Sequence, residues 1–256
     1  MKTNNLKNTI HSSAIIGDDV ILGENNTIGP NVVMMGNIII GNNNYFGANT
    51  IITNNVIIGD NNSFTASSSI GSVGEMGTKG DIFLENGNVV IGNNNVVREF
   101  VAFNSPVRKD TTRIGNNCYF MARSHIPHDA DIRNNVVMAT NSVLGGGSVV
   151  NNYAYVGLGS ITHQWIDIGE SAMIGLQAAV TRHVPPFCII TGVPAKILKL
   201  NRIGLERRGM TDKVLDEVEQ NFKSIIMGEY NSENEIVVKI REFMSQYPQS
   251  LKKFIK

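Results

Sequence analysis

The chain has 256 residues, with 22 acidic and 22 basic side chains. This balance argues against an extended nucleic-acid-binding surface, which requires an excess of positive charge. No apolar run approaches the roughly 20 residues of a membrane span, and the first five residues are polar, so we expect a cytoplasmic protein without membrane insertion. The two cysteines, Cys118 and Cys188, form no metal or redox motif and fit a reducing compartment.

A six-residue register begins near the amino terminus. Its members are all apolar or aromatic: Ile10, Ile16, Leu22, Ile28, Met34, Ile40, Phe46, Ile52, Ile58, Phe64 and Ile70. A strand has a period of two and an α-helix one of 3.6, so a period of six indicates a coil of short strands with a turn after each. Three hexads make a triangular coil of eighteen residues, and coils stack as parallel strands. We therefore predict a mainly β protein, a parallel β-helix in which residues eighteen apart lie on one another.

Asparagine runs fall where this register places turns. Examples are residues 42–44, 61–62 and 93–95. Asparagine tolerates a left-handed backbone and forms local hydrogen bonds, so this richness in asparagine is structural.

The register fails at two places, which we interpret as loops at about residues 72–88 and 104–113. The first contains no hexad, and order resumes at Ile91; the second contains Pro106 and four charged residues. Loops on a rigid repeat often contain binding residues, although a harmless insertion is an equal alternative for the second.

The register returns in a second block from Ile114 to Val180. Of its twelve positions only Thr162 is not apolar or aromatic. Within this block, the eighteen-residue spacing stacks His128, Gly146 and Gln164 in three consecutive coils. A histidine, a bare backbone and an amide at one place favour a functional site over a surface imidazole.

Beyond Val180 the pattern changes. Pro185–Pro186 and residues 192–196 end the coils, because proline cannot donate to a sheet ladder. We predict a β-helix domain over residues 1–196 and a helical domain over 197–256. One helix contains Val214 to Ile226 and ends near Gly228. A second helix starts at a capping box of Ser232 and Glu235 and ends before Pro248. A short third helix with Leu251 follows it.

Four segments together resemble one family. They are Ser124–Asp129 (SHIPHD), Thr162–Trp165 (THQW), Val184–Phe187 (VPPF) and Gly204–Gly209 (GLERRG). In this order they are similar to the LpxA family, which transfers an acyl chain from acyl carrier protein to UDP-N-acetylglucosamine. The resemblance covers nearly the whole chain. It implies a left-handed β-helix, an exception to the usual handedness, and a homotrimer with sites in clefts between neighbours.

The resemblance also implies roles for individual residues. His128 matches the general base, Asp129 the carboxylate that orients it, and the Gly146 N–H the donor to the oxyanion. His125, His163 and Gln164 match residues that line the sugar and pantetheine cleft. Residues near the nucleotide are matched by Asn201, Arg207 and Arg208, although a solvated helix end is an equal alternative for the arginines.

Several positions depart from the family pattern. Met76 and Thr78 replace an acidic residue and a lysine that bind the sugar, and Glu75 or Lys79 would substitute for them if the loop shifts. Histidines of the family become Asn104 and Gly147, and an acidic residue becomes Ile203. Leu176 stands where long-chain enzymes have glycine, so a short acyl chain is expected.

Three hypotheses follow. The first is transfer of a short acyl group from coenzyme A or acyl carrier protein to a nucleotide-linked amino sugar, in glycan or lipopolysaccharide synthesis, with no tightly bound cofactor. The second is an authentic lipid A O-acyltransferase acting on UDP-N-acetylglucosamine. The third is a non-catalytic or zinc-binding hexapeptide protein, in which His125, His128 and His163 are candidate ligands.

Overall fold

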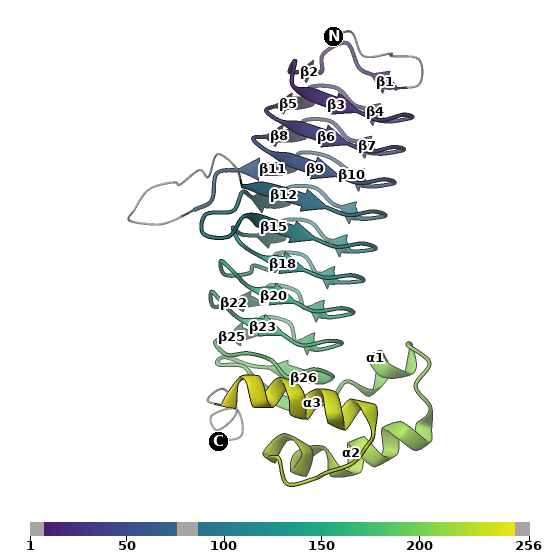
Figure 1. Cartoon of the computed structure of the whole chain (residues 1–256), viewed down its shortest axis with the longest axis vertical. Coiled ribbons are helices and arrows are strands. Elements are labelled where there is room, and N and C mark those ends of the chain that lie inside the picture. Colours follow the sequence, from purple (N-terminus) through teal and green to yellow (C-terminus); the bar gives the residue numbers. More distant parts are fainter. Residues whose placement is uncertain (1–7, 76–86, 249–256) are drawn as a thin grey trace.

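A computed structural model describes residues 8–75 and 87–248 of the chain (Figure 1). The chain is mainly β, a left-handed parallel β-helix followed by helices at the carboxyl end, as predicted. Three faces run along the β-helix. The first face consists of β1 (Thr9–Ile10), β4 (Thr27–Ile28), β7 (Tyr45–Phe46), β10 (Ser63–Phe64), β13 (Val96–Val97), β16 (Tyr119–Phe120), β19 (Val137–Met138), β21 (Tyr155–Val156), β24 (Met173–Ile174), β26 (Cys188–Thr191) and β27 (Lys196–Leu200).

The other two faces complete each coil. The second face consists of β2 (Ile15–Ile16), β5 (Val33–Met35), β8 (Ile51–Thr53), β11 (Ser69–Ser72), β14 (Ala102–Asn104), β17 (His125–Ile126), β22 (Ile161–Thr162) and β25 (Ala179–Val180). The third consists of β3 (Val20–Leu22), β6 (Ile38–Ile40), β9 (Val56–Ile58), β12 (Asn88–Ile91), β15 (Thr111–Ile114), β18 (Asp131–Ile132), β20 (Val149–Val150) and β23 (Asp167–Ile168).

The hexad positions form the core of the β-helix. From Ile28 to Ile70 and from Ile114 to Val180 every apolar member is at most 2 % exposed, whereas Ile10, Ile16 and Leu22 at the open amino end are half-buried. Asparagines occupy the turns in the left-handed region, as predicted, for example Asn43 and Asn61 with φ near 60°. Asn44 and Asn62 also bond to one another in a buried ladder, with a 2.8 Å bond from the Asn62 N–H to the Asn44 Oδ1.

The two breaks in the register are insertions at one corner. Paired residues on the first face are regularly eighteen apart, as Thr9 and Thr27 are, but Ser63 pairs with Val96 and Val96 with Tyr119. These pairs are fifteen and five residues longer than the regular coil. Both insertions lie between the second and third faces, because they separate β11 from β12 and β14 from β15. Met76, Thr78 and Lys79 lie outside the described residues.

Strand structure ends with a hairpin. β26 continues the parallel coil, and β27 turns back against it in the antiparallel direction, so the strands extend four residues past Lys196. Three helices follow, namely α1 (Arg202–Glu206), α2 (Asp212–Met227) and α3 (Glu235–Gln246). Within the described residues, none of them is long and apolar enough to span a bilayer.

The sequence did not predict α1, whereas α2 and α3 match the prediction except at one cap. Gly228 ends α2 with a φ of 77°, and Ile236, Val237 and Ile240 of α3 are buried, as expected. The capping box of Ser232 and Glu235 is wrong: Asn234 caps α3 by accepting the Ile236 N–H at 3.0 Å. The Ser232 hydroxyl does not cap α3 and instead donates a hydrogen bond to Glu217 of α2 at 2.7 Å. The short helix predicted at Leu251 lies outside the described residues.

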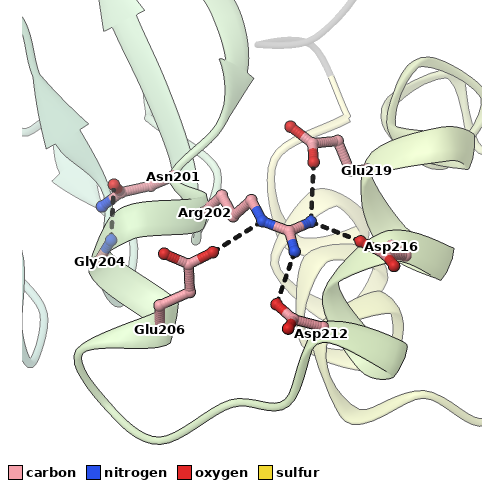
Figure 2. Close-up of polar contacts among 7 residues, drawn as sticks. All are labelled: Asn201, Arg202, Gly204, Glu206, Asp212, Asp216 and Glu219. Atoms are coloured by element: carbon pink, nitrogen blue, oxygen red, sulfur yellow. Dashed lines mark hydrogen bonds and ion pairs between the residues drawn. The ribbon is translucent and has the colours of Figure 1, made fainter.

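Ion pairs and an aromatic stack hold the helices. The guanidinium of Arg202 bonds to four carboxylates at 2.7–3.0 Å, those of Glu206, Asp212, Asp216 and Glu219 (Figure 2). Beyond the end of α3, the Tyr247 ring stacks on that of His183 with 3.9 Å between centroids. Its hydroxyl also donates to Asp167 at 2.7 Å.

Candidate active site

A cleft of about 540 Å³ opens at the corner between the second and third faces. It brings together six of the predicted site residues, one of which, Glu75, lies at the base of the first insertion. The lining consists of Glu75, His125, Pro127, His128, Val143, Leu144, Gly145, Gly146, Thr162, His163 and Gln164. The stack inferred from the eighteen-residue spacing, His128 above Gly146 above Gln164, therefore lies in one cavity.

His128 and Asp129 form a hydrogen-bonded pair at this corner. The Nδ1 of His128 lies 2.8 Å from the Oδ2 of Asp129, and the two side chains are 12 % and 0 % exposed. Because a carboxylate accepts hydrogen bonds only, this contact favours a proton on Nδ1 and leaves Nε2 as the acceptor. Asp129 itself has a left-handed φ of 64°, which this residue type tolerates.

The charge on Asp129 is held by hydrogen bonds. Burial alone would raise the pKa of its carboxyl group, but the bond from His128 and three bonds from backbone amides outweigh burial and lower that pKa. The amides belong to Val107, Arg108 and Lys109 of the second insertion and reach Oδ1 at 2.8–2.9 Å. Asp129 is therefore an ionised partner for His128 near neutral pH.

Gly146 lies against the imidazole. A β-carbon added to Gly146 would lie 2.5 Å from the Cε1 and 2.6 Å from the Nε2 of His128, so any larger residue would displace the ring. In the described part of the chain, the Gly146 N–H takes part in none of the hydrogen bonds, although its carbonyl accepts one from Trp165 at 2.8 Å. This amide N–H is therefore free to donate a hydrogen bond to a group that enters the cleft beside His128.

Two other histidines share the cleft. Burial lowers the pKa of His125. Electrostatic interaction with Glu75 opposes this shift and interaction with His128 adds to it, so the His125 ring is a neutral donor and acceptor near pH 7. His163 is exposed, and its Nδ1 lies 3.2 Å from the Gln164 carbonyl. Among the described residues, no group of three or more His, Cys, Asp or Glu is arranged to hold a metal ion.

The remaining predicted residues lie elsewhere in the chain. Asn104 is buried and donates to the Ser72 hydroxyl at 2.9 Å, which ties the two insertions together. Arg208 binds Glu170 and Ser171 at the corner between the third and first faces, and the side chain of buried Asn201 also bonds to Ser171 there. Exposed Arg207 follows on the same α1 segment.

Leu176 occupies the third corner, between the first and second faces, and is 67 % exposed. Ile203 is likewise exposed on α1. A single chain thus places its catalytic candidates, its arginines and Leu176 at three different corners.

Two contacts in the site were not predicted from the sequence. The Thr162 hydroxyl accepts the Gly145 N–H at 3.0 Å, which explains a polar residue at a hexad position. Trp165 covers Gly147, where an added β-carbon would lie 2.3 Å from the indole ring. The eighteen-residue spacing links Gly147 to Trp165 and was a signal for this contact.

Family models and curated proteins match parts of this chain. Residues 183–256 match the family model described as Udp N-acetylglucosamine O-acyltransferase; Domain 2, and residues 111–146 match Bacterial transferase hexapeptide (six repeats). The acyl-[acyl-carrier-protein]–UDP-N-acetylglucosamine O-acyltransferase of Campylobacter concisus is 39 % identical over 137 residues, which are 53 % of this chain and 52 % of that protein. Its namesake in Gloeothece citriformis is 32 % identical over 170 residues, 62 % of each chain. The chain thus spans about half to three fifths of the length of these curated relatives.

Solved structures match over a longer stretch. The UDP-N-acetylglucosamine acyltransferase of Francisella novicida superposes with a TM-score of 0.81 and 27 % identity, over 96 % of this chain and 90 % of that one. LpxA from Bacteroides fragilis gives the same TM-score and identity over 96 % and 95 %. The chain is therefore similar, in its fold and in parts of its sequence, to the LpxA-like hexapeptide-repeat acyltransferases.

Proposed function

We propose that this protein transfers an acyl group from a thioester donor to a sugar nucleotide, with His128 as the general base. The observation that supports this most directly is the contact of His128 with both Asp129 and Gly146 in one cleft. Asp129 holds the proton on Nδ1, so Nε2 is the free acceptor, and the unused Gly146 N–H lies beside it.

The chemistry then runs in two steps. Nε2 of His128 takes the proton of the acceptor hydroxyl as its oxygen attacks the thioester carbonyl, and the Gly146 N–H stabilises the tetrahedral oxyanion. Collapse of this intermediate breaks the carbon–sulfur bond. The departing thiolate receives the proton from His128, which restores the base and yields acylated sugar and free thiol.

We propose UDP-N-acetylglucosamine as acceptor and an acyl carrier protein as donor, because the relatives with 32–39 % identity carry that name. Transfer of a short acyl group to a nucleotide-linked amino sugar, from coenzyme A or carrier protein, is the second candidate. The contact of Trp165 with Gly147 favours this second candidate. The indole ring occupies the space that a side chain at position 147, such as the histidine of the family, would need. Exposed Leu176 also favours it, since its bulk would shorten an acyl groove.

We further propose a homotrimer. In one chain the cleft at His128 and the Arg208 side chain lie at different corners, so a neighbouring subunit is required to bring an arginine to a nucleotide bound in the cleft. Val143 and Ile161, on the outer side of the second face next to His125, are 38 % and 53 % exposed and offer apolar surface for such a contact.

Substrate turnover tests the proposal. Purified protein is given UDP-N-acetylglucosamine with 3-hydroxyacyl carrier protein, and in parallel a nucleotide-linked amino sugar with short acyl-coenzyme A. Product in the first mixture supports the first candidate, and product only in the second mixture supports the other. No product in either mixture contradicts the proposed acyl transfer.

The His128→Ala enzyme should lose about 10²- to 10⁴-fold in kcat. In co-refolded mixtures of His128→Ala and Arg208→Met subunits, partial recovery of activity would support a shared site.

A further inference from the structure

The second insertion, residues 105–110, contacts the orienting carboxylate rather than the cleft itself. It lies one coil before His128, at the same corner. The amides of Val107, Arg108 and Lys109 all donate to Asp129 Oδ1, at 2.9, 2.9 and 2.8 Å. Oδ2 is thereby left for His128, at 2.8 Å. Consecutive backbone N–H groups that converge on one oxygen make a nest for an anion.

Lys109 adds a contact that the other two residues do not make. Its ammonium donates to the backbone carbonyl of Asp129 at 2.9 Å. The same Nζ lies 5.4 Å from the centroid of the Trp165 ring, and that ring covers Gly147. Lys109 therefore bonds to Asp129 through both its amide and its side chain, and its ammonium also lies near Trp165 of the Gln164 coil, the ring that covers Gly147.

The base of the insertion is fixed to the preceding coil. The Ser105 N–H donates to the Ser72 carbonyl at 2.7 Å, and the Ser105 hydroxyl donates to the Gly71 carbonyl at 2.8 Å. Gly74 fills the gap between Val107 and His128, since an added β-carbon would lie 2.3 Å from the Val107 side chain and 2.9 Å from the His128 Cβ. The insertion is thus bonded to the preceding coil at its base and packed close to the His128–Asp129 pair beyond it.

From these contacts we infer that the second insertion is a positioning element for the His128–Asp129 pair, with Lys109 as its positioning residue. The inference rests on the proposed function, because only catalysis by His128 gives the orientation of Asp129 a purpose. The amides fix the carboxylate, the ammonium fixes its backbone, and the carboxylate fixes the imidazole at Gly146. Hydrogen bonds to a charged group are stronger than those between neutral groups, so these contacts favour this geometry.

The test compares Lys109→Met with Arg113→Met, which removes an exposed cation from β15 just after the insertion. Protein labelled with ¹⁵N-histidine gives a signal for the His128 Nδ1–H, assigned by its loss in His128→Gln. In Lys109→Met we expect this proton to exchange with water about tenfold faster and kcat to fall about tenfold, with KM within about twofold. In Arg113→Met both should match the wild type.

Equal exchange rates and equal kcat in Lys109→Met and wild type would overturn the inference. A rise in KM with unchanged kcat would also overturn it, by making Lys109 a binding residue. Lys109→Arg retains a cation and should restore at least half of kcat, which guards against a Met variant that folds poorly. If the wild type transfers no acyl group, the proposed function fails, while the exchange measurement still decides whether Lys109 positions the pair.

Discussion

Gly146 and His128 are in direct contact across two adjacent coils, eighteen residues apart. The contact leaves no room for a β-carbon, since one added to Gly146 would lie 2.5 Å from the imidazole. Gly146 does not have a positive φ, so the backbone conformation does not require glycine there. The approach of the ring is therefore the reason for glycine at this position.

Gly146→Ala should consequently reduce activity far more than stability. The methyl group displaces the imidazole from the amide, and we expect kcat to fall about 10²- to 10³-fold, the loss typical of an oxyanion donor. Steady-state kinetics and a thermal melt check this. Gly17→Ala is the matched control, because its added β-carbon lies 3.4 Å from its nearest neighbours and away from the cleft. A normal kcat in Gly146→Ala would contradict the proposed contact.

Asp129→Asn should abolish the base without removing the side chain. Its oxygen can still accept the amides of the second insertion, but its NH₂ group then faces Nδ1 of His128. The imidazole must accept at Nδ1 and carry its proton on Nε2, so it cannot deprotonate the acceptor. We expect kcat to fall about 10²- to 10⁴-fold, measured with saturating substrates. Full activity of this variant would remove Asp129 from the mechanism.

The β-helix and the position of the cleft were predictable because the period of six is strict. Burial of one side chain per strand fixes each hexad, so His128, Gly146 and Gln164 had to share a corner. The amides that hold Asp129 were not predictable, because the second insertion has no period and its backbone conformation depends on Ser72 and Gly71 in the coil before.

Two other details depended on partners distant in sequence. Thr162 was visible as an exception to the hexad rule, but its bond to the Gly145 N–H arises only when the coils stack. Ser232 matched a capping box by local spacing, yet Glu217 of the preceding helix competes for its hydroxyl. In both cases tertiary contacts, rather than local propensity, decide the hydrogen bond.

Leu176→Gly should lengthen the acyl chain that the protein accepts. The leucine side chain is 67 % exposed at a turn, so its removal opens space without emptying the core. Competition between donors of increasing chain length measures the effect, and we expect the preferred donor to become longer. Leu198→Gly is the control, because Leu198 is similarly exposed on β27. An unchanged donor profile would separate Leu176 from the acyl groove.

Stability should fall with acidification through His183. Burial lowers the pKa of His183, and the charge of Asp167 only partly opposes this. Its Nδ1 accepts the Asp167 N–H at 3.1 Å and its ring stacks on Tyr247, so the folded state holds it neutral. A pKa that is lower in the folded than in the unfolded state gives stability that is present above the unfolded value, about 6.5, and is lost as pH falls through the folded value.

Melting temperatures measured from pH 7.5 to 5 check this. His183→Gln has no titrating ring at this position, so its melting temperature should decline less over that range than that of the wild type. His125, whose pKa is also lowered by burial, remains in both proteins and contributes equally. Parallel curves for the two proteins would exclude His183 as a source of the acid sensitivity.

Arg202→Met should loosen the carboxyl-terminal helices. The guanidinium joins Glu206 at the end of α1 to three acidic residues of α2, and these hydrogen bonds raise the pKa of Arg202 (Figure 2). Without the cation, Asp212, Asp216 and Glu219 repel one another at successive turns of the helix. We expect faster limited proteolysis after residue 200, and added salt should partly slow it because it screens the repulsion.

Arg207→Met removes a neighbouring exposed cation, for which no ion pair is found in the described part of the chain, and should leave proteolysis unchanged. If both variants are cleaved at the wild-type rate, the four ion pairs of Arg202 contribute little and the apolar contacts of α2 hold the helices. Those contacts are substantial, since Leu215 and Val218 are fully buried. Added salt therefore distinguishes helices held by the ion pairs of Arg202 from helices held by the apolar contacts of α2, because salt weakens ion pairs but not apolar packing.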